Sequence, residues 1–343
     1  MPMYSFLDDY SEGCHPAILE ALARTNLVQQ TAYGDDEYSL QARALIREQL
    51  GSAEVPVHFV ASGTLANLIT IANALRPHEA AIAATSGHIV MRETGAIEAT
   101  GHKIITMPSA DGKLTPTDVE TAVASNAQAP HMAKPRLVYI SNATEFGTVY
   151  SRAELAALRA TCDVHELLLF VDGARLGAAL AAPGNDVTLA YLTSVADAFW
   201  IGGTKTGALI GEAVVIPNPA IAADYAFVVK QRGALLAKGR LLGLQFKTLF
   251  ENGLYFELAS HANTMALKLS DGIVAAGHTL AAKTQSNQVF PVLPNALIGR
   301  LREDFAFYTW SEMDDDRAVI RLVTSWATDE AKVDEFLELI NAV

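Results

Sequence analysis

The chain of 343 residues is predicted to be an α/β protein, with a mostly parallel seven-stranded sheet in a large domain and a smaller C-terminal α/β domain. From about residue 55 to residue 216, short apolar runs alternate with amphipathic helical stretches, a pattern typical of a parallel sheet covered by helices. After about residue 217 the pattern is long and helical to about residue 277, and a shorter strand–helix region closes the chain. The length also exceeds that of one ordinary domain.

Each predicted strand of the large domain is a short apolar run between helical stretches. The first run is followed by a helix through residues 65–69, and an amphipathic helix covers residues 153–158. In the small domain we expect a strand over residues 319–323 and a final helix from about Asp329. The seven strands of the large domain are expected at residues 57–60, 80–84, 103–107, 137–140, 167–171, 198–201 and 212–216.

No stretch rich in Pro, Gly or Ser marks a linker between the two domains. We predict a large domain over residues 1–250 and a small one over residues 251–343, with the first ~15 residues able to pack on the small domain. Ligands of such sheets gather at the carboxyl ends of the strands, so functional side chains are expected there.

Composition and charge argue against several classes of function. Hydrophobic residues make up 50% of the chain and charged residues 18%, so apolar surface is left to bury and self-association is expected. The net charge of −13, without a run of Lys or Arg, argues against nucleic acid and anionic membranes as partners. Two cysteines, no secretory leader and no long apolar stretch predict a cytoplasmic protein.

Two polar side chains follow apolar runs in the middle of the chain. Asp172 comes directly after residues 167–171, and Lys205 follows residues 198–201 among glycines. An amine that forms an imine, beside an acid that keeps a ring nitrogen protonated, is the minimal equipment for pyridoxal phosphate chemistry. Taken alone, Lys205 is equally compatible with a surface turn, and Asp172 with a helix cap or an ion pair to Arg175.

A short polar segment, Ser62-Gly63-Thr64, joins the first predicted strand to the helix after it. Its backbone N–H groups and hydroxyls suit a phosphate, although an ordinary helix cap with a glycine turn has the same pattern. The three-glycine spacing of a dinucleotide fingerprint is missing. Thr204 also stands where a Walker loop needs a glycine before its lysine.

Two further side chains fit an amino-acid site. His88 follows a predicted strand, and its imidazole can lie flat on a planar cofactor or serve as an ordinary structural group. Arg321 is the one cation within an apolar strand and needs an anion, either a substrate carboxylate or one of the carboxylates of residues 314–316. The other histidines lack metal-ligand spacing, so no catalytic metal is expected. Jointly, these groups favour pyridoxal phosphate and an amino-acid substrate.

These segments make the chain similar to the threonine aldolase and β-eliminating lyase family, pyridoxal-phosphate enzymes of the aspartate aminotransferase fold (fold type I). The resemblance runs along nearly the whole chain. Its most specific combination is Asp-Gly-Ala-Arg, which starts at Asp172, together with Thr204-Lys205. The matching segments are residues 8–13, 15–16, 33–38, 61–64, 88, 147–150, 172–175, 204–205, 321 and 324–325.

The resemblance implies a role for each candidate residue. Lys205 would form the imine with the cofactor, Asp172 would protonate its ring nitrogen, and His88 would stack on its ring. The basic segment 230–240 resembles one that reaches a neighbouring subunit's site, so a homodimer would be the minimal active unit and a homotetramer the usual assembly. Further cofactor contacts would come from Ser62, Gly63, Thr64, Arg175, Thr204 and Arg240, and substrate contacts from Ser11, Tyr33, Glu145, Arg175 and Arg321.

One segment departs from the family pattern. Many members place a histidine, which contacts the substrate hydroxyl, just before the segment that corresponds to residues 147–150. This chain has Ser-Asn-Ala-Thr-Glu-Phe at residues 141–146 instead. The base that removes the hydroxyl proton is therefore open among Glu145, His88 and a bound water.

The activity that the resemblance implies is reversible cleavage of an L-β-hydroxy-α-amino acid, such as threonine, to glycine and an aldehyde. Two alternatives keep the cofactor and change the reaction, to β-elimination or to racemisation. A third is a non-catalytic protein that binds the cofactor, supported only by the altered segment at residues 141–146.

Overall fold

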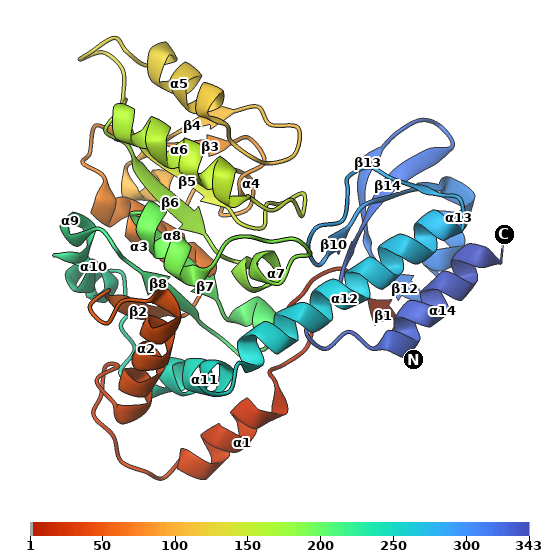
Figure 1. Cartoon of the computed structure of the whole chain (residues 1–343), viewed down its shortest axis with the longest axis horizontal. Coiled ribbons are helices and arrows are strands. Elements are labelled where there is room, and N and C mark those ends of the chain that lie inside the picture. Colours follow the sequence, from red (N-terminus) through yellow and green to blue (C-terminus); the bar gives the residue numbers. More distant parts are fainter. Residues whose placement is uncertain (1–2, 343) are drawn as a thin grey trace.

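The computed structural model describes residues 3–342, and a seven-stranded sheet forms the middle layer of its larger part, on the left in Figure 1. The last five strands of the sheet order are mutually parallel, whereas β8 (Glu212–Val215) is antiparallel to both of its neighbours. The predicted α/β fold with a mostly parallel sheet is confirmed. In spatial order the strands are β2 (Val57–Val60), β8, β7 (Ala198–Gly202), β6 (Leu168–Asp172), β5 (Lys134–Ser141), β3 (Glu79–Ala84) and β4 (Lys103–Met107).

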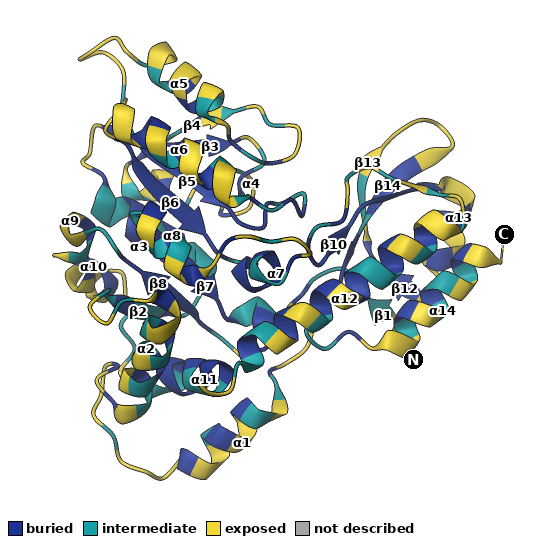
Figure 2. Cartoon of the chain, in the orientation of Figure 1, coloured by how far each residue is buried: buried dark blue, intermediate teal, exposed yellow. Residues whose placement is uncertain are grey.

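Both faces of this sheet are buried, because successive side chains of a strand point to opposite faces. In β5, Val138 and Ile140 enter one core, while Leu137 and Tyr139 enter the other. Figure 2 shows the strands as buried, with exposed residues on the outer sides of the helices. The first core is covered by α1 (Pro16–Thr25), α2 (Glu37–Leu50), α5 (Pro116–Ser125), α6 (Arg152–Val164), α7 (Leu176–Leu180), α8 (Leu189–Val195) and α11 (Arg240–Glu251), and the second by α3 (Gly63–Ala74), α4 (His88–Met91), α9 (Pro219–Ala222) and α10 (Tyr225–Gln231).

Local signals in the sequence account for where several helices begin. The Ser151 side chain caps α6 in a reciprocal arrangement with Glu154, and Thr115 caps α5 in the same way with Asp118. Ser62 caps α3, where its side-chain oxygen accepts a hydrogen bond from the N–H of Leu65. Two short 3₁₀ turns, η1 (Glu98–Thr100) and η2 (Thr204–Thr206), complete this part of the chain.

A long helix, α12 (Leu254–Ala275), runs from the sheet to a smaller C-terminal layer (Figure 1). The predicted strand at residues 319–323 lies within β14 (Arg317–Val323), and the final helix, α14 (Glu330–Asn341), is capped by Asp329 as expected. The layer also holds β9 (Thr279–Leu280), β10 (Gln288–Val289), β11 (Pro291–Pro294), α13 (Asn295–Leu301), β12 (Phe305–Ala306) and β13 (Tyr308–Glu312).

The N-terminal strand β1 (Tyr4–Ser5) pairs in parallel with β12, far along the chain. Phe6 then packs against Phe305 and Phe336 in the core of the C-terminal layer. Residues 4–6 therefore lie on this layer. The division between residues 250 and 251 falls in the last turn of α11 and stays a prediction. No helix within residues 3–342 is both long and apolar enough to span a bilayer.

Gly173 directly follows β6, at a point where no side chain fits. A Cβ atom at this position would lie 1.6 Å from the carbonyl oxygen of Trp200, which is backbone and cannot rotate away. Gly173→Ala is therefore expected to lower the free energy of unfolding by about 3 kcal/mol or more, since overpacking here must displace a strand. Urea unfolding followed by circular dichroism measures this.

Gly299→Ala is the matched control for Gly173→Ala. Gly299 lies in α13, and nothing lies within 4 Å of a Cβ placed there. Its replacement is expected to leave stability unchanged or to raise it by up to about 1 kcal/mol, because alanine favours the helix. Equal effects of the two substitutions would contradict the close packing of β6 against β7.

Candidate active site

A cavity of about 390 Å³ opens where β6 and β7 end, beside the start of α3. This is the edge at which parallel sheets bind ligands. The cavity brings together segments that are far apart in the sequence. Its lining residues are Tyr10, Ala61, Ser62, Gly63, Thr64, Asn67, His88, Asp172, Ala174, Trp200, Thr204, Lys205, Leu209, Ile210 and Glu212.

Lys205 lies in the wall of this cavity, on the turn η2 that follows β7. Its ammonium nitrogen makes no hydrogen bond or ion pair with any residue in the range 3–342, and it lies 5.8 Å from the centre of the Tyr10 ring. Burial, together with the positive charge of Arg175, lowers the pKa of Lys205 below its ordinary value. The side chain is therefore not that of a surface turn, and its amine is suited to act as a nucleophile.

Asp172 ends β6 and is 2% exposed. Its Oδ1 accepts a hydrogen bond from the N–H of Ala174 at 2.9 Å. Its Oδ2 accepts from the Tyr139 hydroxyl at 2.5 Å and from Asn67 at 2.9 Å. The alternative of an ion pair with Arg175 is wrong. Arg175 binds Asp9 instead, so Asp172 faces the cavity without an ion pair to any cation of residues 3–342.

The Arg175 guanidinium forms a two-pronged ion pair with Asp9, from Nε at 2.7 Å and from Nη2 at 3.1 Å. Asn287 also donates to Asp9 Oδ2 at 2.8 Å. Burial raises the pKa of Asp9, but the charges of Arg175 and Lys205 outweigh it, so the pKa lies below its ordinary value. Arg175 is outside the cavity lining and acts on Lys205 through its charge.

The start of α3 supplies the anion cradle. Ser62 is occupied as the helix cap, whereas the backbone N–H groups of Gly63 and Thr64 donate to no other residue in the described range and lie at the cavity wall. Across from them, Thr204 donates its hydroxyl proton to Glu212 Oε1 at 2.7 Å. The free N–H groups and the helix dipole favour an anion at this end of the cavity.

Glu212 is a cavity carboxyl that the sequence interpretation did not single out. It is 4% exposed, and its Oε2 accepts a hydrogen bond from the N–H of Gly203 at 2.9 Å. Burial raises its pKa to about 7. The folded chain therefore binds a proton at Glu212 between its ordinary pKa and about pH 7, and the stability that this proton contributes falls as the pH rises through that window.

Glu212→Gln is expected to flatten this pH dependence in the cofactor-free chain. Relative to the unchanged protein, the variant should gain on the order of 3 kcal/mol of stability between pH 5 and pH 8, because glutamine has no proton to lose. Urea unfolding at a series of pH values measures the gain. Glu335→Gln, on the surface of α14, is the control and should follow the unchanged protein throughout. Parallel curves for Glu212→Gln and the unchanged protein would contradict the raised pKa.

His88 begins α4 and faces the cavity with 39% of its side chain exposed. Its Nδ1 is bound to Glu93 Oε1 at 2.8 Å, so Nε2 is the ring nitrogen left for the cavity. The backbone N–H of His88 donates to Glu145 Oε1 at 2.9 Å, and the Ser141 hydroxyl donates to the same oxygen at 2.8 Å. Burial raises the pKa of Glu145, which is outside the cavity lining.

Arg321 projects from β14 toward the N-terminal segment. Its Nη2 lies 3.7 Å from Asp8 Oδ1 and 3.3 Å from the Leu7 carbonyl oxygen. The alternative partner among residues 314–316 is wrong, because Asp314 pairs with Arg317. The Arg321 Nε atom is buried and has no acceptor within residues 3–342, and burial lowers the pKa of the guanidinium. The Nε–H group of Arg321 is therefore a buried donor that suits an anion.

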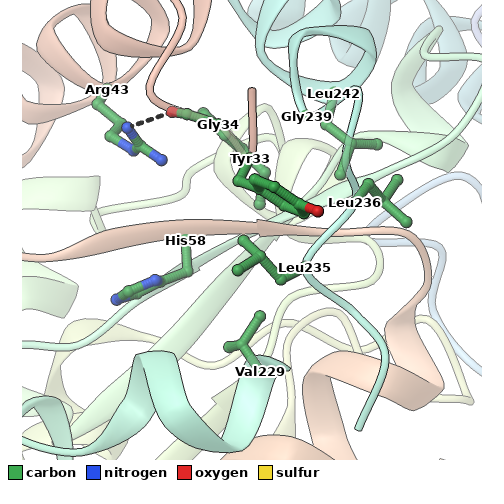
Figure 3. Close-up of a pocket in the computed structure, with 10 residues that line it drawn as sticks. Tyr33, Gly34, Arg43, His58, Val229, Leu235, Leu236, Gly239 and Leu242 are labelled. Atoms are coloured by element: carbon green, nitrogen blue, oxygen red, sulfur yellow. Dashed lines mark hydrogen bonds between the residues drawn. The ribbon is translucent and has the colours of Figure 1, made fainter. Parts of the chain in front are cut away.

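Six predicted contact residues are outside the cavity lining: Arg175, Glu145 and Arg321, described above, and Ser11, Arg240 and Tyr33. Ser11 is exposed, and its hydroxyl donates to the Asp8 carbonyl oxygen. Arg240 donates to the backbone oxygens of Val28 and Thr25. Tyr33 lines a separate pocket of about 30 Å³ beside His58, where Arg43 donates to the Gly34 carbonyl oxygen at 2.8 Å (Figure 3). The roles of these six residues stay predictions.

The sequence interpretation missed several residues that the fold brings to the site. Asn67 follows Thr64 by three residues and shares its side of α3, so helical spacing was a signal. Trp200 lies two residues before Gly202 in β7, so its side chain is on the same face of the sheet as position 202. Tyr10, Tyr139 and Glu93 carried no local signal. Within residues 3–342 no cluster of three or more His, Cys, Asp or Glu side chains is placed to hold a metal ion.

Comparison with known proteins identifies the family of the chain. The family model described as β-eliminating lyase matches residues 6–296. Low-specificity L-threonine aldolases of Pseudomonas sp. and Pseudomonas aeruginosa are 35% and 33% identical to the chain, and each alignment covers 98% of it and 96% of the relative. A threonine aldolase structure from Leishmania major has a TM-score of 0.96 and 49% identity, over 98% of each chain.

A more distant structure shows how widely the fold is shared. Aspartate aminotransferase from Thermus thermophilus has a TM-score of 0.72 at 15% identity, covers 99% of this chain and 91% of its own, and shows the fold alone. The predicted relation to aspartate aminotransferase in fold is thereby confirmed. With the family match over most of its length and full-length relatives above 30% identity, this chain belongs to the β-eliminating lyase family.

Proposed function

We propose that this protein is a pyridoxal-phosphate-dependent aldolase that cleaves L-threonine and related L-β-hydroxy-α-amino acids to glycine and an aldehyde. The observation that carries the proposal is the position of Lys205 and Asp172 in the wall of one cavity, opposite the start of α3. The relatives that share the whole length of the chain carry the name low-specificity L-threonine aldolase.

The residues present fit pyridoxal phosphate. The free N–H groups of Gly63 and Thr64 suit its phosphate, with Thr204 nearby. Lys205 has a lowered pKa and no bound partner in residues 3–342, as an amine that binds an aldehyde requires. Asp172 is a buried carboxylate with three donors and no ion pair among the described residues, so it can hold a proton on a ring nitrogen. When bound, the cofactor would accept the electrons left by cleavage at the substrate's α-carbon.

The geometry favours His88 over Glu145 as the group that accepts the proton of the substrate hydroxyl. His88 lines the cavity and has Nε2 free, because Glu93 holds Nδ1. Glu145 is outside the lining, and its Oε1 already accepts two hydrogen bonds. Glu93 would stabilise the imidazolium that forms on His88.

The substrate carboxylate would bind Arg321, whose buried Nε lacks an acceptor within residues 3–342. Two parallel N–H donors of a guanidinium match a carboxylate, and the Asp8 contact at 3.7 Å is too long to saturate them. Binding there would fix the orientation of an amino acid, with its α-amine toward Lys205.

The active form is proposed to be a homodimer or a homotetramer. Arg240 and Tyr33 lie outside the chain's own cavity, which agrees with a role at a neighbouring subunit's site. Large apolar side chains are also exposed, with Leu27 at 92% and Phe227 at 76%.

The decisive experiment is product analysis with purified protein loaded with pyridoxal phosphate. L-Threonine, L-allo-threonine and an aromatic β-hydroxy amino acid should each yield glycine and an aldehyde in equal amounts. The loaded protein should also absorb at about 420 nm through its imine. Pyruvate with ammonia, or the D-amino acid, would replace the proposal with β-elimination or racemisation.

A further inference from the structure

Asn67 occupies the centre of the wall that carries Asp172 and His88. It lies one helical turn after Thr64 on α3 and is 0% exposed, although its position borders the cavity. Its side chain makes hydrogen bonds to three other side chains: Glu93, Asp172 and Trp200. A buried amide with this many specific partners holds them in fixed positions.

The orientation of the Asn67 amide follows from the chemistry of its neighbours. The Trp200 indole nitrogen can only donate, so the group that faces it at 3.1 Å must be the amide oxygen of Asn67. The amide nitrogen is thereby turned to the other side. Its two hydrogens bind Glu93 Oε1 at 2.8 Å and Asp172 Oδ2 at 2.9 Å.

Each of these carboxylates leads on to a further group. Glu93 Oε1 also binds Nδ1 of His88 at 2.8 Å. Asp172 Oδ2 also accepts the hydroxyl proton of Tyr139 at 2.5 Å. An unbroken chain of hydrogen bonds therefore runs from His88 through Glu93, Asn67 and Asp172 to Tyr139, and Asn67 is its central link.

Two buried carboxylates on either side of one amide repel each other, and a donor that is hydrogen-bonded to both offsets part of that repulsion. The Glu93 side chain is 0% exposed, and its Oε2 has no partner in the described residues. The shared donor, Asn67 Nδ2, is what fixes Glu93 and Asp172 relative to each other. A change in the position or charge of one carboxylate therefore alters the hydrogen bonding of the other.

We propose that Asn67 is a positioning residue that couples Asp172 to His88 through Glu93, so that the ring acid and the imidazole are held as one unit. The inference rests on the proposed function, because these two groups are the ones assigned to the cofactor's ring nitrogen and ring face. Asn67 itself is not assigned a chemical step.

The test is a double-mutant cycle between Glu93→Gln and Tyr139→Phe, which lie at opposite ends of the chain of hydrogen bonds and outside the cavity lining. The dissociation constant for pyridoxal phosphate is measured by absorbance for both single variants and the double variant. With Asn67 present, the fold-change of this dissociation constant in the double variant should differ from the product of the two single fold-changes by about threefold or more. When the cycle is repeated in the Asn67→Leu background, the fold-change of the double variant should equal the product of the two single fold-changes within error.

Additive effects with Asn67 present would overturn the proposal, and so would coupling that persists in the Asn67→Leu background. A purely structural role for Asn67 would weaken cofactor binding without changing the coupling. The cycle with Asn67 present does not require the Asn67→Leu variant to fold.

Failure of the proposed function is distinguishable from failure of this inference. Protein that shows no spectral change with pyridoxal phosphate would refute the proposed function. The same cycle, measured on the free energy of unfolding in urea without the cofactor, then tests whether the two ends of the hydrogen-bond chain are coupled. Coupling there supports the link through Asn67, and additivity refutes it.

Discussion

Lys205→Ala is expected to reduce the rate of glycine release from L-threonine on the order of 10⁴-fold, because the amine that binds the cofactor's aldehyde is lost. The side chain stands in the cavity wall with a lowered pKa, and no other lysine is among the residues that line the cavity, so no neighbouring amine replaces it. The absorbance at about 420 nm should also disappear, since it arises from the imine. Glycine release and the spectrum are measured on the same protein sample.

Lys332→Ala is the control for this prediction. Lys332 lies on the surface of α14, where it pairs with Glu335, and is remote from the cavity. Its replacement should leave both the spectrum and the rate unchanged. Cofactor absorbance that survives in Lys205→Ala at the unchanged position would remove Lys205 from its proposed role.

Asp9→Ala is expected to lower the free energy of unfolding by about 3–5 kcal/mol, because it leaves the Arg175 guanidinium buried without its anion. Asp9 is 0% exposed and accepts hydrogen bonds from Arg175 and from Asn287. Since its pKa is lowered on folding, the ion pair stabilises the fold above the ordinary pKa of an aspartate. That contribution is lost as the pH falls through the lowered pKa, so the effect should shrink in strong acid.

Asp314→Ala is the matched control for Asp9→Ala. Asp314 also pairs with an arginine, Arg317, but both side chains are exposed, so solvent screens the pair. Its removal should cause no measurable change in urea unfolding. If Asp9→Ala were as mild as Asp314→Ala, the buried pair would not be what anchors the N-terminal segment beside the site.

The sheet could be predicted from the sequence because its signals are local. Most of its strands are apolar runs that are buried on both faces, and helical stretches separate these runs along the chain. The place of β8 had no such signal. It lies between β2 and β7 and runs antiparallel to both, which depends on how the turn after Lys205 folds back.

The candidate site was predictable where a polar residue directly follows a strand. Asp172 is the last residue of β6, Thr204 and Lys205 come within three residues of the end of β7, and Ser62 to Thr64 start a helix after a strand. The partners of these groups were not predictable. Asp9 precedes Arg175 by 166 residues, and no local pattern indicates which of 38 acidic residues a buried arginine will bind.

The sequence by itself determined the order of strands and helices along the chain, and it placed Lys205, Asp172 and residues 62–64 at strand and helix ends. Those features depend on residues that are close together in the chain. Only the tertiary structure decided which groups hold the site residues: Asn67 between two carboxylates, and Asp9 on Arg175. Such contacts join distant segments, because burying a charge requires a partner that only folding brings near.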